Sequence, residues 1–323
     1  MTDEDRRPRT GREDGATDPG DASASGRPDD TAVGFTWGET EQLTWLRGPD
    51  GGYKRVDPGF LETLHAVAAG ERSLADLSNE ERTAFEHLRR EGFLDDSGTV
   101  RRVPTPDGIR LGPRLAAFGA AFGLLTLYVA YRFTAGADVP TVATADVSVL
   151  WQMLASLPVF VGMALVHEAG HYLAARPYMD TRVEPTLLNG VFPAVVTKTN
   201  DAWRCPRSVR IWINLAGPFA DALQCLALAG LSLFVWSGSA LLAVVPVFEY
   251  FRILFAVNPL VRGDGYWMIV DWFGATNLYT RGKRDLKNRE PTLRAAFALG
   301  SVAFTVVGAA AMAFFLARMI GLA

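Results

Sequence analysis

Apolar runs long enough to cross a lipid bilayer occupy the second half of this 323-residue chain and most constrain its fold. The bilayer core takes roughly 20 residues of α-helix to cross, whereas residues 1–112 are mostly polar and charged. The candidate membrane spans are about 114–134, 148–174, 209–236, 240–257 and 293–317. This pattern predicts an all-α polytopic membrane bundle of about five or six transmembrane helices over residues 113–323.

The distribution of Lys and Arg between the loops predicts how this bundle faces. Loop 135–147 contains neither residue, whereas loops 175–208 and 258–292 are rich in both. Loops on the cytoplasmic side of a membrane carry an excess of positive charge. We therefore expect a multi-pass protein of the cell (cytoplasmic) membrane with its N-terminus in the cytoplasm. The first thirty residues hold no apolar signal-peptide core, so the first span is expected to act as the insertion signal.

The polar part of the chain divides into a tail and a small domain. Residues 1–32 are rich in Asp, Arg, Gly, Ser and Pro without apolar periodicity, which predicts a disordered tail. Residues 33–112 predict a small cytoplasmic α+β domain with its linker to the membrane. Within it, apolar spacing over 57–70 is typical of a helix.

A second helix and two hairpins complete this predicted domain. The helix begins at a capping box formed by Ser78 and Glu81. Residues 93–103 predict a β hairpin that turns at 96–98, and residues 40–56 predict another that turns at 49–52. Two helices followed by a hairpin are the outline of a winged-helix domain.

Winged-helix domains bind either peptides or nucleic acid. The basic residues of this one are interspersed with acidic residues, and the whole chain has a net charge of only −3. This mixed charge favours peptide recognition over nucleic acid, so no nucleic-acid partner is expected. Inert packing against the membrane bundle is the other interpretation. The basic residues are Arg89, Arg90, Arg101 and Arg102.

The sequence "HEAGH" places His167, Glu168 and His171 inside the second apolar span. Positions i and i+4 of a helix share a face, so the two imidazoles can bind one zinc ion and the glutamate can act on a water molecule. Titratable residues are rare in membrane spans and are usually functional there. Arg176 follows His167 by nine residues, which corresponds to roughly 14 Å of helix. We expect one Zn²⁺ site inside the membrane, near its cytoplasmic side.

A catalytic zinc site needs a third protein ligand and one open position. Asp264 is the best candidate, because "NPLVRGDGYW" breaks the apolar pattern with Pro and Gly at the end of the fourth span. Asp221, inside the third span, is the runner-up. Glu249 and Arg252 are also inside a span, and their spacing predicts a structural ion pair.

Three motifs together resemble a known family. "HEAGH" at 167–171, "NLAGP" at 214–218 and "NP…DGYW" at 258–267 resemble the site-2 protease family of intramembrane zinc metallopeptidases. "TNDAWRCPRSVRIWINLAGP" and "NPLVRGDGYWMIVDWFGATNL" resemble the branch of putative peptide zinc metalloproteases found beside ribosomally synthesised, modified peptides.

This resemblance implies a site-2 protease-like core with a short β hairpin and assigns roles to the site residues. It implies His167, His171 and Asp264 as zinc ligands, Glu168 as catalytic acid/base and Asn258 as a polar group near the scissile carbonyl. Many members have Asn where this chain has Asp221, which leaves Asp221 as a possible secondary site residue.

"ERSLADLSNEERTAFEHLRREGFL" in the small domain is similar to the PqqD-like peptide-recognition fold, which implies a leader peptide as its partner. The expected function is therefore an intramembrane zinc endopeptidase that matures, or removes the leader of, a ribosomally made peptide. One alternative is a regulated protease that cleaves a membrane-anchored signalling protein. A non-enzymatic alternative is a membrane transport or immunity factor with a structural metal site.

The segment "TLLNGVFPAVVTKT", residues 186–199, is β-prone and follows the HExxH helix. It can pair with an unwound substrate as an added strand. The equally weighted alternative is a hairpin that only plugs the bundle.

Overall fold

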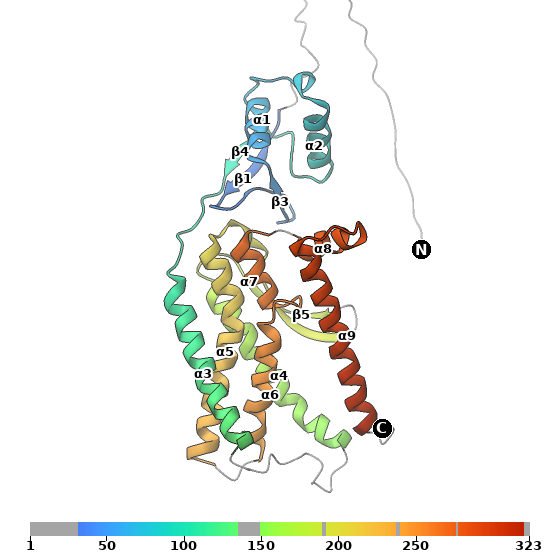
Figure 1. Ribbon diagram of the computed structural model, residues 1–323. Coiled ribbons are helices and arrows are strands. Elements are labelled where there is room, and N and C mark those ends of the chain that lie inside the picture. The colour runs from blue at the N-terminus through green and yellow to red at the C-terminus, as the bar shows by residue number, and fades with distance from the viewer. Residues whose placement is uncertain (1–31, 135–148, 189–191, 237–239, 276, 320–323) are drawn as a thin grey trace, which may run out of the picture.

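The computed structural model describes residues 32–134, 149–188, 192–236, 240–275 and 277–319. The predicted tail, residues 1–32, lies outside the described residues except for its last residue, and so does loop 135–147. The described part of the chain is mostly helical and contains two small sheets. Figure 1 shows a domain of helices and strands above a bundle of long helices.

Long helices occupy all five of the segments predicted from the apolar runs. They are α3 (Leu111–Thr134), α4 (Val149–Ala175), α5 (Arg207–Phe234), α6 (Ala240–Ala256) and α9 (Leu293–Met319). Among the described residues, α3 and α5 are long and apolar enough to cross a bilayer, judged by length and composition alone. The helices are therefore found where they were expected, whereas a bundle of five or six membrane spans remains a prediction.

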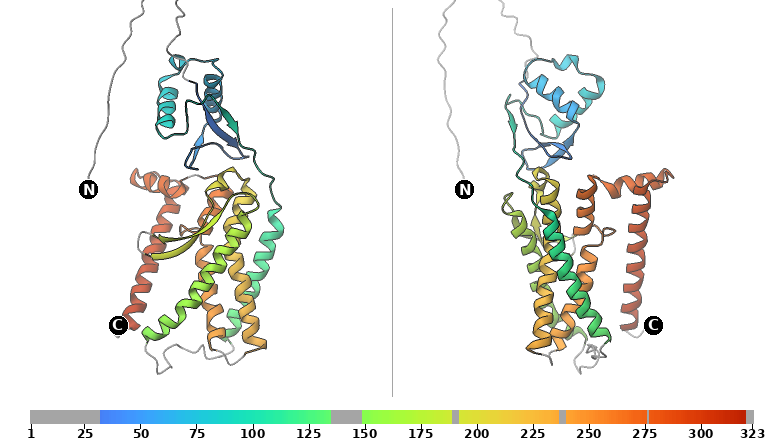
Figure 2. Two further views of the ribbon diagram at one scale, coloured as in Figure 1. Left: turned by 180° about the vertical axis from the view of Figure 1, so that it is seen from behind. Right: turned by 60° about the vertical axis from the view of Figure 1, so that its left-hand side comes forward.

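Helix α5 is the centre of the bundle and packs against α3, α4, α6 and the short helix α7 (Asp264–Phe273). Helices α3, α5 and α6 together bury an apolar cluster that includes Leu125 of α3, Cys225 of α5 and Ile253 of α6. Helix α8 (Leu278–Lys287) packs against α9 at the side of the bundle. Figure 2 shows this arrangement from two further directions.

The small domain is built on a four-stranded sheet in the order β3-β2-β1-β4. Strands β1 (Phe35–Glu39), β2 (Thr44–Arg47) and β3 (Tyr53–Val56) form an antiparallel meander. The hairpin predicted over residues 40–56 is thus confirmed. Helices α1 (Pro58–Ala68) and α2 (Asn79–Arg90) follow, and their buried side chains share one core with the sheet. The capping box of Ser78 and Glu81 is confirmed at the start of α2.

The second predicted hairpin is wrong. All of residues 93–103 are described, and they contain one strand, β4 (Val100–Arg102), which pairs in parallel with Phe35–Trp37 of β1. The turn residues 96–98 instead lead the chain back to the first strand, where Gly34 and Asp95 form an isolated bridge. The domain is α+β as predicted, but its fourth strand extends the main sheet and does not form a separate wing.

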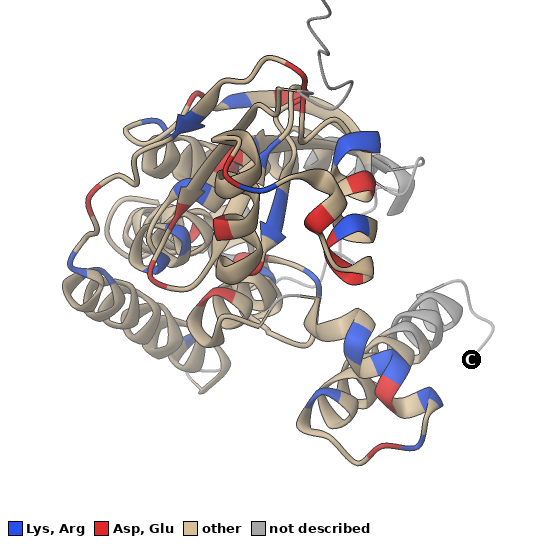
Figure 3. Ribbon diagram, turned by 90° about the horizontal axis from the view of Figure 1, so that it is seen from above, with Lys and Arg blue, Asp and Glu red and all other residues tan. Residues whose placement is uncertain are grey.

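A β hairpin follows α4, as the resemblance implied. Strand β5 (Arg182–Leu188) pairs antiparallel with β6 (Phe192–Lys198), and both contact α4. The hairpin and α8 lie toward the end of the bundle nearest the small domain in Figures 1 and 2. Figure 3 views the molecule from this end and shows both basic and acidic residues on the elements found there.

Candidate metal centre

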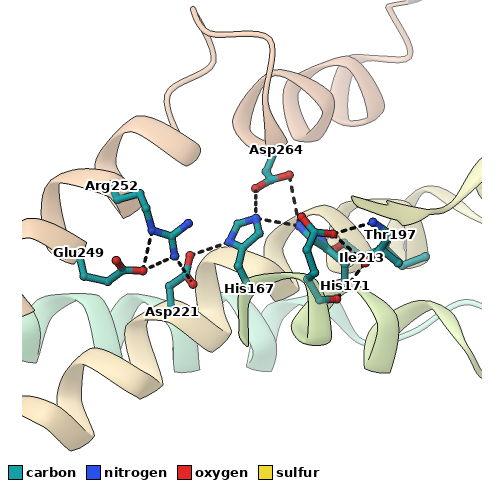
Figure 4. A network of polar contacts seen from close by, with 9 residues as sticks. His167, His171, Thr197, Ile213, Asp221, Glu249, Arg252 and Asp264 are labelled. Carbon is teal, nitrogen blue, oxygen red and sulfur yellow. Dashed lines mark hydrogen bonds and ion pairs between the residues drawn. The ribbon is translucent and has the colours of Figure 1, made fainter. Parts of the chain in front are cut away.

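Two histidines and one aspartate meet between α4 and α7 (Figure 4). The Nε2 atoms of His167 and His171 lie 3.1 Å apart, since the two residues are one turn apart on α4. Asp264 opens α7 and faces them: Oδ2 lies 3.2 Å from Nε2 of His167, and Oδ1 lies 3.4 Å from Nε2 of His171. Side chains from two elements therefore converge on one point.

The other nitrogen of each imidazole is already bound. Nδ1 of His167 donates a hydrogen bond to Oδ2 of Asp221 at 2.6 Å, and Nδ1 of His171 donates to the carbonyl oxygen of Ile213 at 2.7 Å. Carboxylate and carbonyl oxygens only accept, so the proton of each neutral imidazole resides on Nδ1. Both Nε2 lone pairs are thereby available on the side of Asp264. Such partners fix the tautomer and the orientation of metal-binding histidines.

The spacing of these three side chains is close to that of zinc ligands. Tetrahedral angles with metal–ligand distances of about 2.0–2.1 Å place the ligand atoms roughly 3.3 Å apart. The two Nε2 atoms lie 3.1 Å apart, Oδ2 of Asp264 lies 3.2 Å from Nε2 of His167, and Oδ1 lies 3.4 Å from Nε2 of His171. One ligand atom from each residue lies within 4.8 Å of the other two. Two imidazoles and one carboxylate are also a ligand set found in catalytic zinc sites. His167, His171 and Asp264 could therefore hold a metal ion.

The close packing of α4 on α5 depends on two glycines. A Cβ atom at Gly217 would lie 2.3 Å from Nε2 of His171 and 2.8 Å from Cε1 of His167. A Cβ atom at Gly170 would lie 2.3 Å from the carbonyl oxygen of Ala216. Side chains at these positions would separate the helices or displace the imidazoles. This gives a physical reason for glycine in the motifs "HEAGH" and "NLAGP".

Glu168 is beside the cluster but is not among its ligands. Its Oε2 accepts two hydrogen bonds from Thr197 of β6, one from the backbone N–H at 2.7 Å and one from the hydroxyl at 2.8 Å. Thr197 Oγ1 also lies 3.0 Å from the backbone carbonyl of Glu168. The β hairpin thus holds the glutamate of the HExxH motif.

Asp221 contacts the opposite edge of the His167 ring from the ligand nitrogen, so it is not placed as the third ligand. Its side chain is fully buried and forms an ion pair with Arg252 of α6. Arg252 also donates from Nε to Oε1 of Glu249 at 2.7 Å. The predicted ion pair of Glu249 and Arg252 is thus confirmed, and the guanidinium also binds Asp221, because it has enough donors to bridge two acids. Arg252 thus links Glu249 to Asp221, which contacts His167 of the candidate metal centre.

Asn258 lies at the break between α6 and α7. Its Oδ1 accepts a hydrogen bond from the backbone N–H of Leu260 at 2.9 Å. This contact closes the turn at Pro259, after which the chain enters α7 at Asp264. The structure therefore places Asn258 in the loop that leads to Asp264, the candidate third ligand, with its side-chain oxygen bound to that loop.

Sequence reasoning missed three contributors to this site: Thr197, Gly217 and the carbonyl of Ile213. Gly217 and Ile213 lie in or next to the quoted motif "NLAGP", which was a signal for their region but not for their roles. Thr197 lies in a segment predicted to be β-prone, and nothing in its spacing pointed to Glu168.

Comparison with known proteins adds no assignment: no protein-family model, curated protein or solved structure matches this chain.

Proposed function

We propose that this protein is an intramembrane zinc endopeptidase. The observation that carries the proposal is the cluster itself: two imidazole nitrogens that face one carboxylate and could hold a metal ion with it, with Glu168 next to them and outside the ligand set. A structural zinc site is closed by four protein ligands, whereas a catalytic site keeps one position open. Three candidate ligands among the described residues therefore favour catalysis over a transport or immunity factor with a structural metal.

We place this enzyme in the cell membrane with its N-terminus in the cytoplasm. Five long helices coincide with the five apolar runs, and the basic loops alternate with loops that lack Lys and Arg. Buried ionisable residues in apolar helices usually mark a functional site. His171 and Asp221 are such residues, and the short distance along the chain from the motif to Arg176 supports a site near the cytoplasmic side.

The proposed reaction is hydrolysis of a peptide bond. A zinc ion held by His167, His171 and Asp264 supplies Lewis acidity, which polarises the carbonyl and makes water more acidic. Glu168 takes a proton from the attacking water and later delivers it to the leaving amine. Asn258 is proposed to act as a polar group near the scissile carbonyl, where its side-chain amide N–H can donate a hydrogen bond.

The β5–β6 hairpin offers a way to present an extended substrate to this site. Because the N–H of Thr197 is directed at Glu168, the edge of β6 that does not pair with β5 faces the helix that carries the site. A substrate that unwinds can add to such an edge as a strand. The alternative, in which the hairpin plugs the bundle, uses the same contact.

We propose as substrate a ribosomally made peptide whose leader is removed, with the leader bound by the small α+β domain. This part of the proposal follows from the resemblance of the motifs and of the N-terminal domain. Cleavage of a membrane-anchored signalling protein would use the same chemistry and is the second candidate. No nucleic acid is involved in either.

The proposal is tested with purified protein in lipid nanodiscs and a pool of quenched-fluorescent peptides that contain a hydrophobic segment. We expect cleavage that a chelator abolishes and that added Zn²⁺ restores. Cleavage that persists at full rate after all zinc has been removed would refute the metallopeptidase assignment.

A further inference from the structure

The small domain is fastened to the membrane bundle by a set of polar contacts. Asp201, in the short 3₁₀-helix η3 (Asn200–Arg204), accepts a hydrogen bond from the Tyr53 hydroxyl at 2.8 Å and pairs with Arg47 at 3.2 Å. The Tyr53 ring also stacks on Trp203, with ring centroids 6.5 Å apart. Burial and the hydrogen bond to Asp201 raise the pKa of Tyr53 above its usual value. The hairpin of β2 and β3 is thus anchored.

The turn between β1 and β2 makes a second set of contacts, to the beginning of α5. Glu41 accepts a hydrogen bond from the backbone N–H of Arg207, the first residue of α5, at 2.9 Å. Pro206 occupies the N-cap position and makes no side-chain cap, so an acidic residue of the small domain satisfies this helix end. Next to it, Oε1 of Gln42 accepts a hydrogen bond from Nη2 of Arg210 at 2.9 Å.

Arg210 transmits this contact to the candidate metal centre. Its side chain is only 7% exposed, and its guanidinium is shared among three elements. Nη2 binds Gln42, Nη1 donates to the carbonyl of Cys205 at 2.7 Å, and Nε donates to Oδ1 of Asp271 at 2.7 Å. Asn214 donates to the other oxygen of Asp271 at 3.2 Å. Both oxygens of this carboxylate are therefore held.

Asp271 lies on α7, the helix that begins with Asp264. Seven residues separate the two aspartates, which is about two turns or roughly 10.5 Å, so both lie on one face of α7. The same face thus contacts α4 histidines at one end and Arg210 at the other. The position of α7 is set by these two contacts together.

We propose that Arg210 is a positioning residue for the metal ligand Asp264, and that the small domain keeps Arg210 in place through Gln42. The role of Asp264 rests on the proposed function, whereas the anchoring of α7 does not. The small domain then has two tasks: it binds a peptide, and it completes the support of the catalytic helix. Loss of the small domain therefore lowers zinc occupancy and the turnover rate as well as the affinity for substrate.

The test compares Gln42→Leu with the matched control Gln42→Glu in the full-length protein. Leu removes the acceptor for Arg210, and Glu keeps it and adds an opposite charge. Amide hydrogen exchange of α7, measured with a chelator present, reports the anchor without metal. We expect exchange to rise roughly tenfold in Gln42→Leu, the effect of losing one hydrogen bond to a charged group, and to remain at the wild-type rate in Gln42→Glu.

Release of zinc to the chelator is the second measurement, and we expect it to be about tenfold faster in Gln42→Leu and in Arg210→Met. Unchanged α7 exchange in both variants would overturn the anchor. Faster α7 exchange in Arg210→Met but not in Gln42→Leu would show that the small domain does not hold Arg210 in place. Faster exchange with unchanged zinc release would overturn the positioning of Asp264. A wild-type protein that binds no zinc would refute the proposed function, and α7 exchange would still decide the anchor.

Discussion

Thr197 donates two hydrogen bonds to Oε2 of Glu168, from its backbone N–H at 2.7 Å and from its hydroxyl at 2.8 Å. The two residues come from β6 and α4 and are far apart in the sequence. The contact makes the hairpin part of the structure that orients the proposed general base.

Removing the Thr197 hydroxyl therefore tests this relationship. Thr197→Val keeps the shape and the backbone N–H, and we expect about tenfold slower cleavage, because a hydrogen bond to a charged group is lost. Thr197→Ser restores the donor and is expected to cleave at nearly the wild-type rate. Zinc content is measured in both variants as a control. Equal rates for the Val and Ser variants would show that the hydroxyl does not position Glu168.

Asp221 is expected to support the metal through His167. Asp221→Leu removes the acceptor of the Nδ1–H group, and we expect zinc affinity to fall roughly 10–100-fold. Asp221→Asn keeps an oxygen acceptor and is expected to lose less. Competition with a chromogenic chelator measures both. Asp264→Asn serves as the comparison, since loss of a ligand should exceed both effects. Zinc affinity that falls with Asp221→Asn but not with Asp264→Asn would exchange the roles of the two aspartates.

Substitution of Gly217 is expected to affect the site by steric hindrance alone. The added methyl group of Gly217→Ala would have to lie 2.3 Å from Nε2 of His171, so the imidazole or the helix must shift. We expect at least a tenfold loss of zinc affinity from this displacement of the ligands. Gly230→Ala, on the same helix with open space around its Cβ position, is the matched control. Equal zinc affinity in the two variants would contradict the packing of α5 against the histidines.

The helices and the candidate metal ligands were largely predictable from the sequence, for physical reasons. The long helices could be predicted because the length and apolar composition of a segment are local properties, which do not depend on its packing partners. His167 and His171 were predictable because the period of the helix puts them on one face. Asp264 was predictable because Pro259 and Gly263 mark a break that returns the chain to the same depth.

The remaining contacts depend on how distant elements pack, which local patterns do not encode. The pairing of Val100–Arg102 with Phe35–Trp37 joins strands more than sixty residues apart, so the local turn at 96–98 suggested a hairpin instead. Arg252 contacts Asp221 only because α5 and α6 pack side by side. Its nearer acidic neighbour, Glu249, was the only partner that spacing could reveal.

The predicted orientation is tested with reporter fusions. A reporter fused after Val142 should be active only when exported, and one fused after Lys283 only in the cytoplasm, because the basic residues are concentrated in alternate loops. Both fusions are compared at equal expression. The reverse pattern would exclude the proposed topology and, with it, the placement of the site near the cytoplasmic side.

The central claim is that Glu168 activates water beside a metal that it does not bind. Glu168→Gln keeps the size of the side chain and an acceptor for Thr197 but cannot take up a proton as a carboxylate does. The decisive measurement determines zinc content and peptide cleavage in the same Glu168→Gln preparation. The account predicts wild-type zinc with cleavage reduced by at least about 10²-fold, the scale of lost general acid–base catalysis. Full cleavage with full zinc would contradict it and leave the cluster as a structural metal site.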